Sequence, residues 1–483
     1  MSYINKTLHY TIQVPGAQSC GVLDVSSPFN AERVASIETI DKKGAEQALQ
    51  NAFQAFSKRN NWLPADKRIA ILERTAQLMR ERFDSLVQIA VLEGGKPLID
   101  TRIEVERAID GVRVCIDCIR NEHGQAIPMQ LNPASSQRFA ITHKEPIGVV
   151  VAVSAFNHPL NLIVHQVCPA IASGCPVIIK PAEDTAASCF ELIKLLREAG
   201  LPDVWCQAVA VNDIEVAEKL VTDSRVAFFS FIGSANIGWM LRSKLSAGTR
   251  CALEHGGAAP VIVAEDADLD DVLPLLVKGG FYHAGQVCVS VQRVFVHKSL
   301  IKQVAERMSK LVSELQVGDP LLATTQVGPL IRHRETTRIA EWVNSAVASG
   351  AQVLTGGKIL SEAFYAPTVL LNPSKTSEVS QKEIFGPVVC LYDYEHIDDA
   401  VKQANSLPYA FQAAVMSQNI DTIMYVYKRL AASAVMVNDH SAFRVDWMPF
   451  AGLRHSGYGV GGIPYTYNDM QIEKMLVIRS RAI

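Results

Sequence analysis

The sequence has no excess of charge of either sign and no apolar run long enough to cross a bilayer. Its 483 residues include 46 Lys and Arg against 49 Asp and Glu, a formal net charge of −3 at pH 7. No overall field attracts the chain to nucleic acid or to an anionic membrane, so we expect neither partner. The longest apolar stretches, such as Ile147–Phe156, fall short of the roughly 20 residues that a membrane-spanning helix needs.

The cysteines also lack the spacing of a disulfide framework, and no signal peptide is recognisable ahead of them. A reducing, cytoplasmic compartment is therefore the expected one. The close pair Cys115 and Cys118 has no second Cys or His pair near it in the sequence, so it does not predict a tetrahedral zinc site. We expect no metal.

No repeat, low-complexity tract or long charged block is present, and 48% hydrophobic with 20% charged residues is the composition of an ordinary globular protein. The length predicts about three structural units. Helical periodicity dominates the N-terminal portion, over residues 42–59 and again from Asp66 to Glu93. The second stretch is predicted as one helix, ended by Gly94, Gly95 and Pro97.

After Pro146, short apolar strands alternate with helices. Residues 147–154, 176–180 and 226–231 are predicted strands, and residues 186–199 are a predicted helix between them. This alternation predicts a doubly wound α/β sheet. A second set begins at Ala259, with strands at 261–263, 291–296, 388–391 and 413–416 and helices at 339–348 and 398–404.

Two segments fit neither set: Asn121–His143, which is polar with strand-like pieces, and the tail Tyr465–Ile483. Both have the character of exposed edge strands, which are costly unless they are covered. Pairing within an oligomer would cover them.

A cysteine is a strong nucleophile only as an accessible thiolate. Cys288 stands out because Gly285, just ahead of it, allows a backbone or a ligand to approach closely, and because a predicted strand begins directly after it. The other nine cysteines lie in apolar or helical contexts. On context alone, Cys288 is either a catalytic nucleophile or a buried structural thiol.

Two further polar side chains end apolar segments. Glu254 precedes Gly256 and Gly257, where partial desolvation would raise its pKa and suit it to general-base catalysis; a local cap or ion pair is the alternative. Asn157 follows a strand, and ligands bind at the carboxyl ends of strands in open α/β sheets. Its amide either donates to an oxyanion or caps the next helix.

Two turns that follow strands are candidate cofactor segments. Gly233 and Ser234 stand between a strand and a helix, as a phosphate-binding turn must, but the three-glycine dinucleotide fingerprint is incomplete. Lys180 and Glu183 place a cation and a carboxylate three residues apart. Alone, that pair would be a solvated turn.

Together these segments stand in the order and approximate spacing of the aldehyde dehydrogenase superfamily, which the chain resembles over essentially its whole length. The motifs that carry the resemblance are Ala155–Leu160, Lys180–Glu183, Phe231–Ser234, Leu253–Gly257, Gly285–Cys288, Glu383–Pro387 and Pro449–Gly452. The resemblance implies an α/β fold of two doubly wound domains plus a small β oligomerisation element. It also implies a homodimer or homotetramer.

The resemblance assigns each stretch of the chain to a domain. Residues 1–120 and 144–253 would form a discontinuous NAD-binding domain, and residues 254–455 the catalytic thiol domain. Residues 121–143 and 463–483 would form the bridging element.

The resemblance also implies a mechanism. The Cys288 thiolate would attack the aldehyde carbon, with the oxyanion held by the Asn157 amide and the cysteine N–H. After hydride leaves to nicotinamide, Glu254 would activate water to hydrolyse the thioester to a carboxylic acid.

Six positions are implied at the cofactor. Lys180 and Glu183 would meet the adenosine ribose hydroxyls, and Gly233 with Ser234 the pyrophosphate. Glu383 would meet the nicotinamide ribose, and Phe385 would flank the ring. Because a carboxylate at position 183 repels a 2′-phosphate, NAD is expected over NADP, with NADP still possible.

The segment around Arg444 resembles the subset of the superfamily that acts on short polar or anionic aldehydes, such as lactaldehyde, succinate semialdehyde and phosphonoacetaldehyde. Arg444 would hold an anionic group by a forked pair, or else form a salt bridge to Asp446 or to a neighbouring subunit. Arg107 and His158 are further candidates for binding substrate.

His255 and Ala451 depart from the family pattern, in which Leu and Gly are usual. Neither departure removes a catalytic group. Two alternatives stay open: a CoA-acylating relative, which typically lacks the carboxylate matching Glu254, and a non-catalytic binding protein with this fold.

Overall fold

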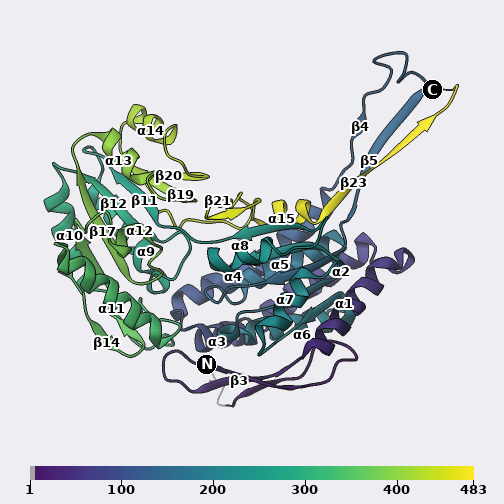
Figure 1. Cartoon of the computed structure of the whole chain (residues 1–483), viewed down its shortest axis with the longest axis horizontal. Helices are drawn as coiled ribbons and strands as arrows, with labels where there is room; N and C mark the ends of the chain where they lie inside the picture. The colour runs from purple at the N-terminus through teal and green to yellow at the C-terminus, as the bar shows by residue number, and fades with distance from the viewer. Residues whose placement is uncertain (1–5, 483) are drawn as a thin grey trace.

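The computed structural model describes residues 6–482 and contains two mainly parallel sheets, each flanked by helices, with an antiparallel arm projecting from one of them (Figure 1). The first sheet has the order β22-β10-β9-β6-β7-β8. Its strands are β6 (Val149–Val153), β7 (Val177–Lys180), β8 (Cys206–Ala208), β9 (Val226–Ile232), β10 (Arg250–Glu254) and β22 (Gly457–Tyr458). All of them pair in parallel except β22, which lies antiparallel to β10.

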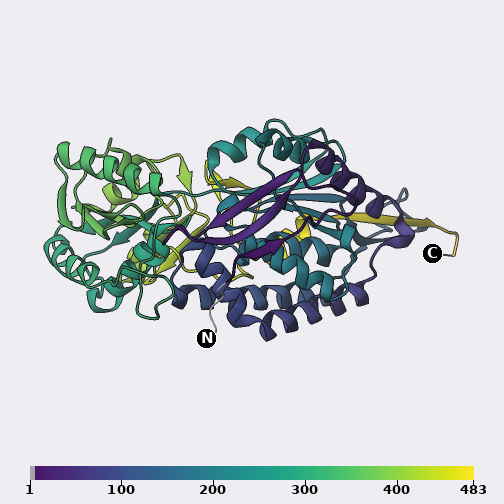
Figure 2. The same cartoon turned by 90° about the horizontal axis from the view of Figure 1, so that it is seen from below.

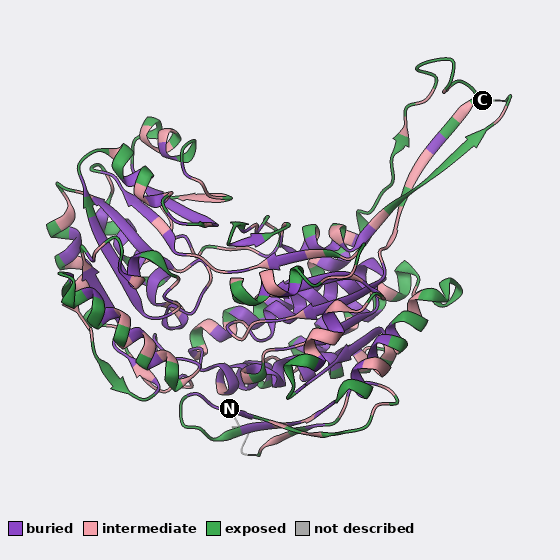
Figure 3. Cartoon of the chain, viewed as in Figure 1, coloured by how far each residue is buried: buried purple, intermediate pink, exposed green. Residues whose placement is uncertain are grey.

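Both faces of this sheet are buried, as its continuous apolar sequence predicts. Along β6, Val150 and Ala152 belong to one core and Val149 and Val151 to the other, on either side of the sheet. Figure 3 shows the strands of this region coloured as buried. The surrounding helices are α1 (Lys42–Ser57), α2 (Ala65–Glu81), α3 (Phe83–Gly94), α4 (Leu98–Arg120), α5 (Asn161–Ser173), α6 (Ala187–Glu198), α7 (Ile214–Thr222) and α8 (Ala235–Arg242).

The single helix expected over 66–93 is wrong, because the chain breaks into α2 and α3 at Arg82 (φ −109°, ψ 21°). Asp84 lies in the first turn of α3, where a carboxylate favours a new helix start. The apolar period continues across the break because both helices bury their faces in one core, through residues such as Leu72 and Leu86.

An N-terminal sheet, which helical periodicity did not predict, has the order β1-β3-β2. Its strands are β1 (Leu8–Tyr10), β2 (Gly21–Ser26) and β3 (Arg33–Thr39). It lies across the side of the first unit seen in Figure 2. Only one of its faces is buried, so its strands carry less apolar sequence than those of the main sheet.

The second sheet has the order β13-β16-β17-β12-β11-β19-β20, again parallel except at one edge, where β13 is antiparallel. Its strands are β11 (Ala259–Val263), β12 (Val291–His297), β13 (Gln352–Thr355), β16 (Thr368–Leu371), β17 (Val388–Tyr394), β19 (Gln412–Met416) and β20 (Ala434–Val437). Its helices are α9 (Leu269–Phe281), α10 (Ile301–Ser313), α11 (His333–Ala348), α12 (Glu378–Gln381), α13 (Ile397–Ala404) and α14 (Ile420–Tyr427). The two doubly wound α/β units expected from the sequence are confirmed.

The arm consists of β4 (Ala126–Ile127), β5 (Arg138–Pro146) and the C-terminal β23 (Gln471–Arg479), in the order β23-β5-β4. β23 pairs with β5 along its whole length. The expectation that the tail is strand-like from Tyr465 onward is wrong for its first residues, because they belong to the helix α15 (Ile463–Asp469) that precedes β23. No helix among residues 6–482 is long and apolar enough to span a membrane.

Candidate active site

Parallel pairing brings four chain segments to one edge of the first sheet. Val153, at the end of β6, is in register with Lys180 of β7 and Phe231 of β9, and Ile232 is in register with Glu254 of β10. β7 and β9 lie on opposite sides of β6, so the strand order reverses there. Such a topological switch point is the usual ligand site in open α/β sheets.

The second sheet contributes residues at the amino ends of its strands. Cys288 lies just before β12, and Glu383 just before β17. Both edges line one cavity of about 1060 Å³, at the upper end of the range of about 300–1,000 Å³ typical of ligand sites. All of the site residues predicted from the sequence line this cavity, including Arg107, His158 and Arg444.

The loop that carries Cys288 has a constrained backbone. His283, Ala284 and Gly285 have φ of 48°, 55° and 69°, a left-handed turn that costs free energy at the two non-glycine residues. A Cβ on Gly285 would lie 2.2 Å from the Gly386 carbonyl oxygen, so only glycine fits there. Cys288 is half-buried at the end of this turn.

Gln286 ties the Cys288 loop to its surroundings and was missed by the sequence argument. Its Nε2 donates to the Pro329 carbonyl at 3.3 Å, and its Oε1 accepts from the Ile331 N–H at 2.9 Å. Its own carbonyl accepts from Asn157 Nδ2 at 2.9 Å. A primary amide has two N–H groups, so Asn157 keeps a second donor at this position.

Burial shifts the pKa values of Cys288 and Glu254. It raises the pKa of the Cys288 thiol to about 12, a rise that the nearby Arg444 charge opposes. Burial likewise raises the pKa of Glu254, again opposed by Arg444. The direction for Glu254 is the one predicted from its position beside the diglycine turn.

Glu254 is packed tightly at the end of β10. Its Oε2 lies 3.9 Å from Arg444 Nη1, a loose ion pair. A Cβ on Gly461 would lie 2.1 Å from Glu254 Oε1, so the backbone of the returning chain supports the carboxylate directly.

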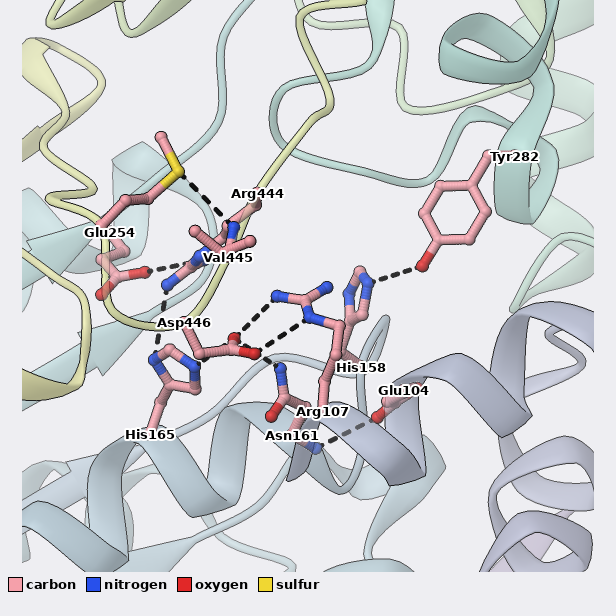
Figure 4. A network of polar contacts seen from close by, with 11 residues as sticks. Glu104, Arg107, His158, Asn161, His165, Glu254, Tyr282, Arg444, Val445 and Asp446 are labelled. Atoms are coloured by element: carbon pink, nitrogen blue, oxygen red, sulfur yellow. Dashed lines mark hydrogen bonds and ion pairs between the residues drawn. The ribbon is translucent and has the colours of Figure 1, made fainter. Parts of the chain in front are cut away.

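A buried polar network surrounds Asp446 (Figure 4). Its carboxylate accepts from Arg107 Nε at 3.0 Å and Nη2 at 2.7 Å, and from Asn161 Nδ2 at 3.2 Å. His165 Nε2 lies 2.7 Å from the same carboxylate. Although burial alone would raise the pKa of Asp446, the bonds from His165 and Arg107 hold it well below its usual range.

Arg444 joins this network through His165, whose Nδ1 lies 3.4 Å from Arg444 Nη2. The guanidinium carbon lies 3.5 Å from the centroid of the Phe450 ring. The buried Nε of Arg444 has no hydrogen-bond partner among the described residues. Among those residues, its ion-pair partner is Glu254 rather than Asp446. His158, by contrast, is hydrogen-bonded to the Tyr282 hydroxyl at 2.8 Å.

The predicted cofactor residues lie along the rest of the cavity. Lys180 Nζ lies 3.5 Å from Glu183 Oε1, and Ser234 is the N-cap of α8. Glu383 accepts from the Gly257 N–H at 3.2 Å, and burial raises its pKa to about 8. Phe385 meets Phe156 edge-to-face at 5.8 Å between ring centroids.

His255, one of the departures from the family pattern, packs beside the turn at Gly233 and Ser234. Its Nδ1 lies 3.0 Å from the Gly233 carbonyl oxygen, and its ring meets Phe231 and Trp239 at centroid distances of 5.6 and 5.8 Å. Gly238 of α8 has to be glycine, because its Cβ would lie 2.0 Å from His255 Cε1.

Cys288, Asn157 and Glu254 thus line one cavity, and the family model "Aldehyde dehydrogenase family" matches residues 15–476. The chain belongs to the aldehyde dehydrogenase family. It is an NAD(P)-dependent oxidoreductase that acts on an aldehyde group, and neither the CoA-acylating nor the non-catalytic alternative is favoured.

Individual relatives of this aldehyde dehydrogenase are similar over nearly their whole length. It is 34% identical to a 3-sulfolactaldehyde dehydrogenase from Priestia aryabhattai, over 99% of this chain and 100% of that protein. Aldehyde dehydrogenase 21 from Physcomitrella patens, solved with the reaction product succinate, superposes with a TM-score of 0.94 at 34% identity, over 98% and 99% of the two chains. A glyceraldehyde-3-phosphate dehydrogenase from Methanocaldococcus jannaschii, solved with NADP, superposes at 0.91 and 31%, over 96% and 100%.

Proposed function

We propose that the enzyme oxidises a small anionic aldehyde to its carboxylic acid. The observation that carries the proposal is Arg444, whose side chain is 11% exposed and lines the cavity beside Glu254. The ion pair with Glu254, at 3.9 Å, is loose, so a carboxylate or sulfonate on the substrate could accept from the guanidinium. Arg107 adds a second positive charge to the same cavity. Both 3-sulfolactaldehyde and succinate, in the names of the relatives, are anionic, which supports the same substrate class.

The chemistry assigned to this chain starts at Cys288. Its thiolate adds to the aldehyde carbon, and the resulting oxyanion accepts from the Asn157 amide and the Cys288 N–H. A bound nicotinamide cofactor supplies the hydride acceptor for this reaction. Glu254 then takes a proton from water, whose oxygen adds to the thioester carbon, and the carboxylic acid leaves as the thiol is regenerated.

For the cofactor, we propose that Lys180 and Glu183 bind the adenosine ribose, and that Gly233 and Ser234 bind the pyrophosphate. Glu383 and Phe385 take the nicotinamide end. The close approach that this needs is available: Gly256 leaves no room for a side chain, since a Cβ there would lie 1.6 Å from Glu383 Oε1. We propose NAD over NADP because the Glu183 carboxylate repels a 2′-phosphate.

We propose that the chain has the domain boundaries that the family pattern implies. Residues 1–120 and 144–253 serve the cofactor, residues 254–455 supply the thiol, and residues 121–143 with 463–483 bridge subunits. Lys180 ends β7 and Gly233 follows β9 of the first sheet, whereas Cys288 precedes β12 of the second, which supports this division.

We also propose a homo-oligomer, a dimer or tetramer, assembled through the arm. Four consecutive apolar residues of β23, Met475 to Ile478, are each more than 40% exposed in the single chain, and exposed apolar strand edges are normally covered. A reducing, cytoplasmic setting would keep Cys288 as a free thiol.

A panel of short aldehydes, neutral, carboxylated, sulfonated and phosphonated, tests the substrate proposal through formation of the reduced cofactor. We expect the wild-type enzyme to favour the charged aldehydes and Arg444→Met to lower their kcat/KM by about tenfold to a hundredfold, since a charged hydrogen bond is worth roughly 1.5–3 kcal/mol. Arg113→Met, at an exposed arginine of α4 outside the cavity, is the control. An unchanged ranking in Arg444→Met would contradict the proposal, and CoA-dependent formation of acyl-CoA would assign a different reaction.

A further inference from the structure

His165 lies between Asp446 and Arg444 and touches both (Figure 4). Its side chain is 2% exposed, with Nε2 at 2.7 Å from Asp446 Oδ1 and Nδ1 at 3.4 Å from Arg444 Nη2. It projects from α5 one turn after Asn161, which also donates to Asp446. The two side chains share one helix face and meet the same carboxylate.

The partners of the two ring nitrogens fix the state of the imidazole. A guanidinium can only donate, so Nδ1 has to present a lone pair to Arg444. A carboxylate with a depressed pKa can only accept, so Nε2 has to carry the proton toward Asp446. Only the neutral tautomer with hydrogen on Nε2 satisfies both neighbours, and burial lowers the pKa of His165, which favours the neutral ring.

We propose that His165 is a positioning residue that holds Arg444 where it can bind the anionic group of the aldehyde. This inference rests on the proposed anionic substrate. Asp446 would orient both arginines of the cavity, Arg107 by a forked pair and Arg444 through His165.

Without the His165 lone pair, the nearest remaining partner for Arg444 is Glu254, whose Oε2 is already within 3.9 Å. A closed Arg444–Glu254 ion pair would occupy the donor that is otherwise free for the anionic group of the substrate. His165 therefore influences substrate choice without touching the reacting atoms.

Three substitutions separate the two bonds of the ring. His165→Asn places an amide oxygen near the position of Nδ1, so it keeps the acceptor for Arg444 and gives up the donor to Asp446. His165→Gln places an amide near the position of Nε2, so it keeps the donor and gives up the acceptor. His165→Phe keeps the ring shape and gives up both.

The measurement is kcat and KM for succinate semialdehyde and for butanal, a neutral aldehyde with the same number of carbons, in the wild type and the three variants. We expect His165→Phe and His165→Gln to raise the KM for succinate semialdehyde by about tenfold, the loss of one charged hydrogen bond, and to change butanal less than about twofold. We expect His165→Asn to retain most of the wild-type ratio.

The outcomes distinguish this inference from the proposal on which it rests. A wild-type enzyme that does not favour succinate semialdehyde over butanal overturns the anionic substrate and the inference with it. A wild type that does favour it, with the ratio intact in His165→Gln and His165→Phe, overturns the role of His165 alone. If His165→Phe fails to fold, His165→Gln decides, since it keeps a polar partner for Asp446; a retained thermal midpoint confirms that it is folded.

Discussion

At the scale of single residues, burial raises the pKa of the Cys288 thiol to about 12, which favours the neutral form of the proposed nucleophile. Well below that value, the thiolate fraction of a thiol rises about tenfold for each pH unit. The Arg444 cation opposes the rise, so Cys288 and Arg444 are coupled even before substrate binds.

We therefore expect the rate of Cys288 alkylation by iodoacetamide to increase about tenfold per unit between about pH 6 and about pH 9, since only the thiolate reacts. Arg444→Met should slow the reaction at every pH in that range, because it removes the charge that lowers the thiol pKa. Mass spectrometry of the modified peptide, with Cys288→Ser as the unlabelled control, gives the rate at this site. A plateau below about pH 8 would show an ionised resting thiol and contradict the prediction.

In the proposed binding mode, cofactor choice also depends on a single residue. The Glu183 side chain is 54% exposed and its carboxylate lies 3.5 Å from Lys180 Nζ, at the end of the cavity remote from Cys288 in the proposed binding mode. Glu183→Gln removes the charge that repels a 2′-phosphate and keeps the shape of the side chain.

We expect Glu183→Gln to reduce the ratio of kcat/KM for NAD to that for NADP by about tenfold, mainly through a lower KM for NADP. Glu106→Gln, at an exposed carboxylate of α4 outside the cavity, should leave the ratio unchanged. Steady-state kinetics with both cofactors at low salt measure it, and an unchanged ratio in Glu183→Gln would place cofactor selection elsewhere.

At the scale of elements, the site depends on a chain return that crosses from the second sheet to the first. β22 pairs with β10, with Gly457 opposite Glu254, and the loop that follows brings Gly461 against the Glu254 carboxylate. The position of the Glu254 carboxylate is thus set by a strand pairing between segments about two hundred residues apart in sequence.

We expect Gly461→Ala to impair hydrolysis of the thioester, because its Cβ would lie 2.1 Å from Glu254 Oε1 and force the carboxylate to move. Like Glu254→Gln, it should retain a burst of reduced cofactor and lose steady-state turnover by about 10²-fold, the usual contribution of a general base. Stopped-flow absorbance separates the two phases. Gly318→Ala is the matched control, since its nearest neighbour would be Thr325 Oγ1 at 3.8 Å; a normal turnover in Gly461→Ala would contradict this account.

At the scale of the whole molecule, the arm is the feature whose apolar side chains a single chain leaves exposed. It extends away from both α/β units in Figure 1, and β23 buries almost none of its apolar side chains. We expect Met475→Glu combined with Val477→Glu to shift the enzyme to a smaller species, because two added charges oppose burial in an interface. Sedimentation velocity measures the change.

Ile420→Glu combined with Met424→Glu is the control for this experiment. These side chains of α14 are 66% and 40% exposed, so the added charges have the same chemistry at positions outside the arm. A monomeric wild-type enzyme, or an unchanged assembly in the double variant, would contradict the proposed role of the arm.

The family and the α/β class follow from local sequence, because parallel strands buried on both faces have continuous apolar runs and because the motifs around Asn157, Glu254 and Cys288 keep a characteristic order. The helix break at Arg82 and the N-terminal sheet did not follow. A helical period continues where two helices bury their faces in one core, and a sheet with one buried face carries a weaker apolar pattern.

The chemistry and order of the residues available for catalysis could be read from the chain alone. Their partners depend on the folded structure: Arg444 contacts Glu254 and His165, Asp446 binds Arg107, and Gln286 fixes the Cys288 loop. These contacts join α4, α5, β10 and two loops that are remote in sequence. Hydrogen bonds and ion pairs depend on distances that local periodicity does not encode.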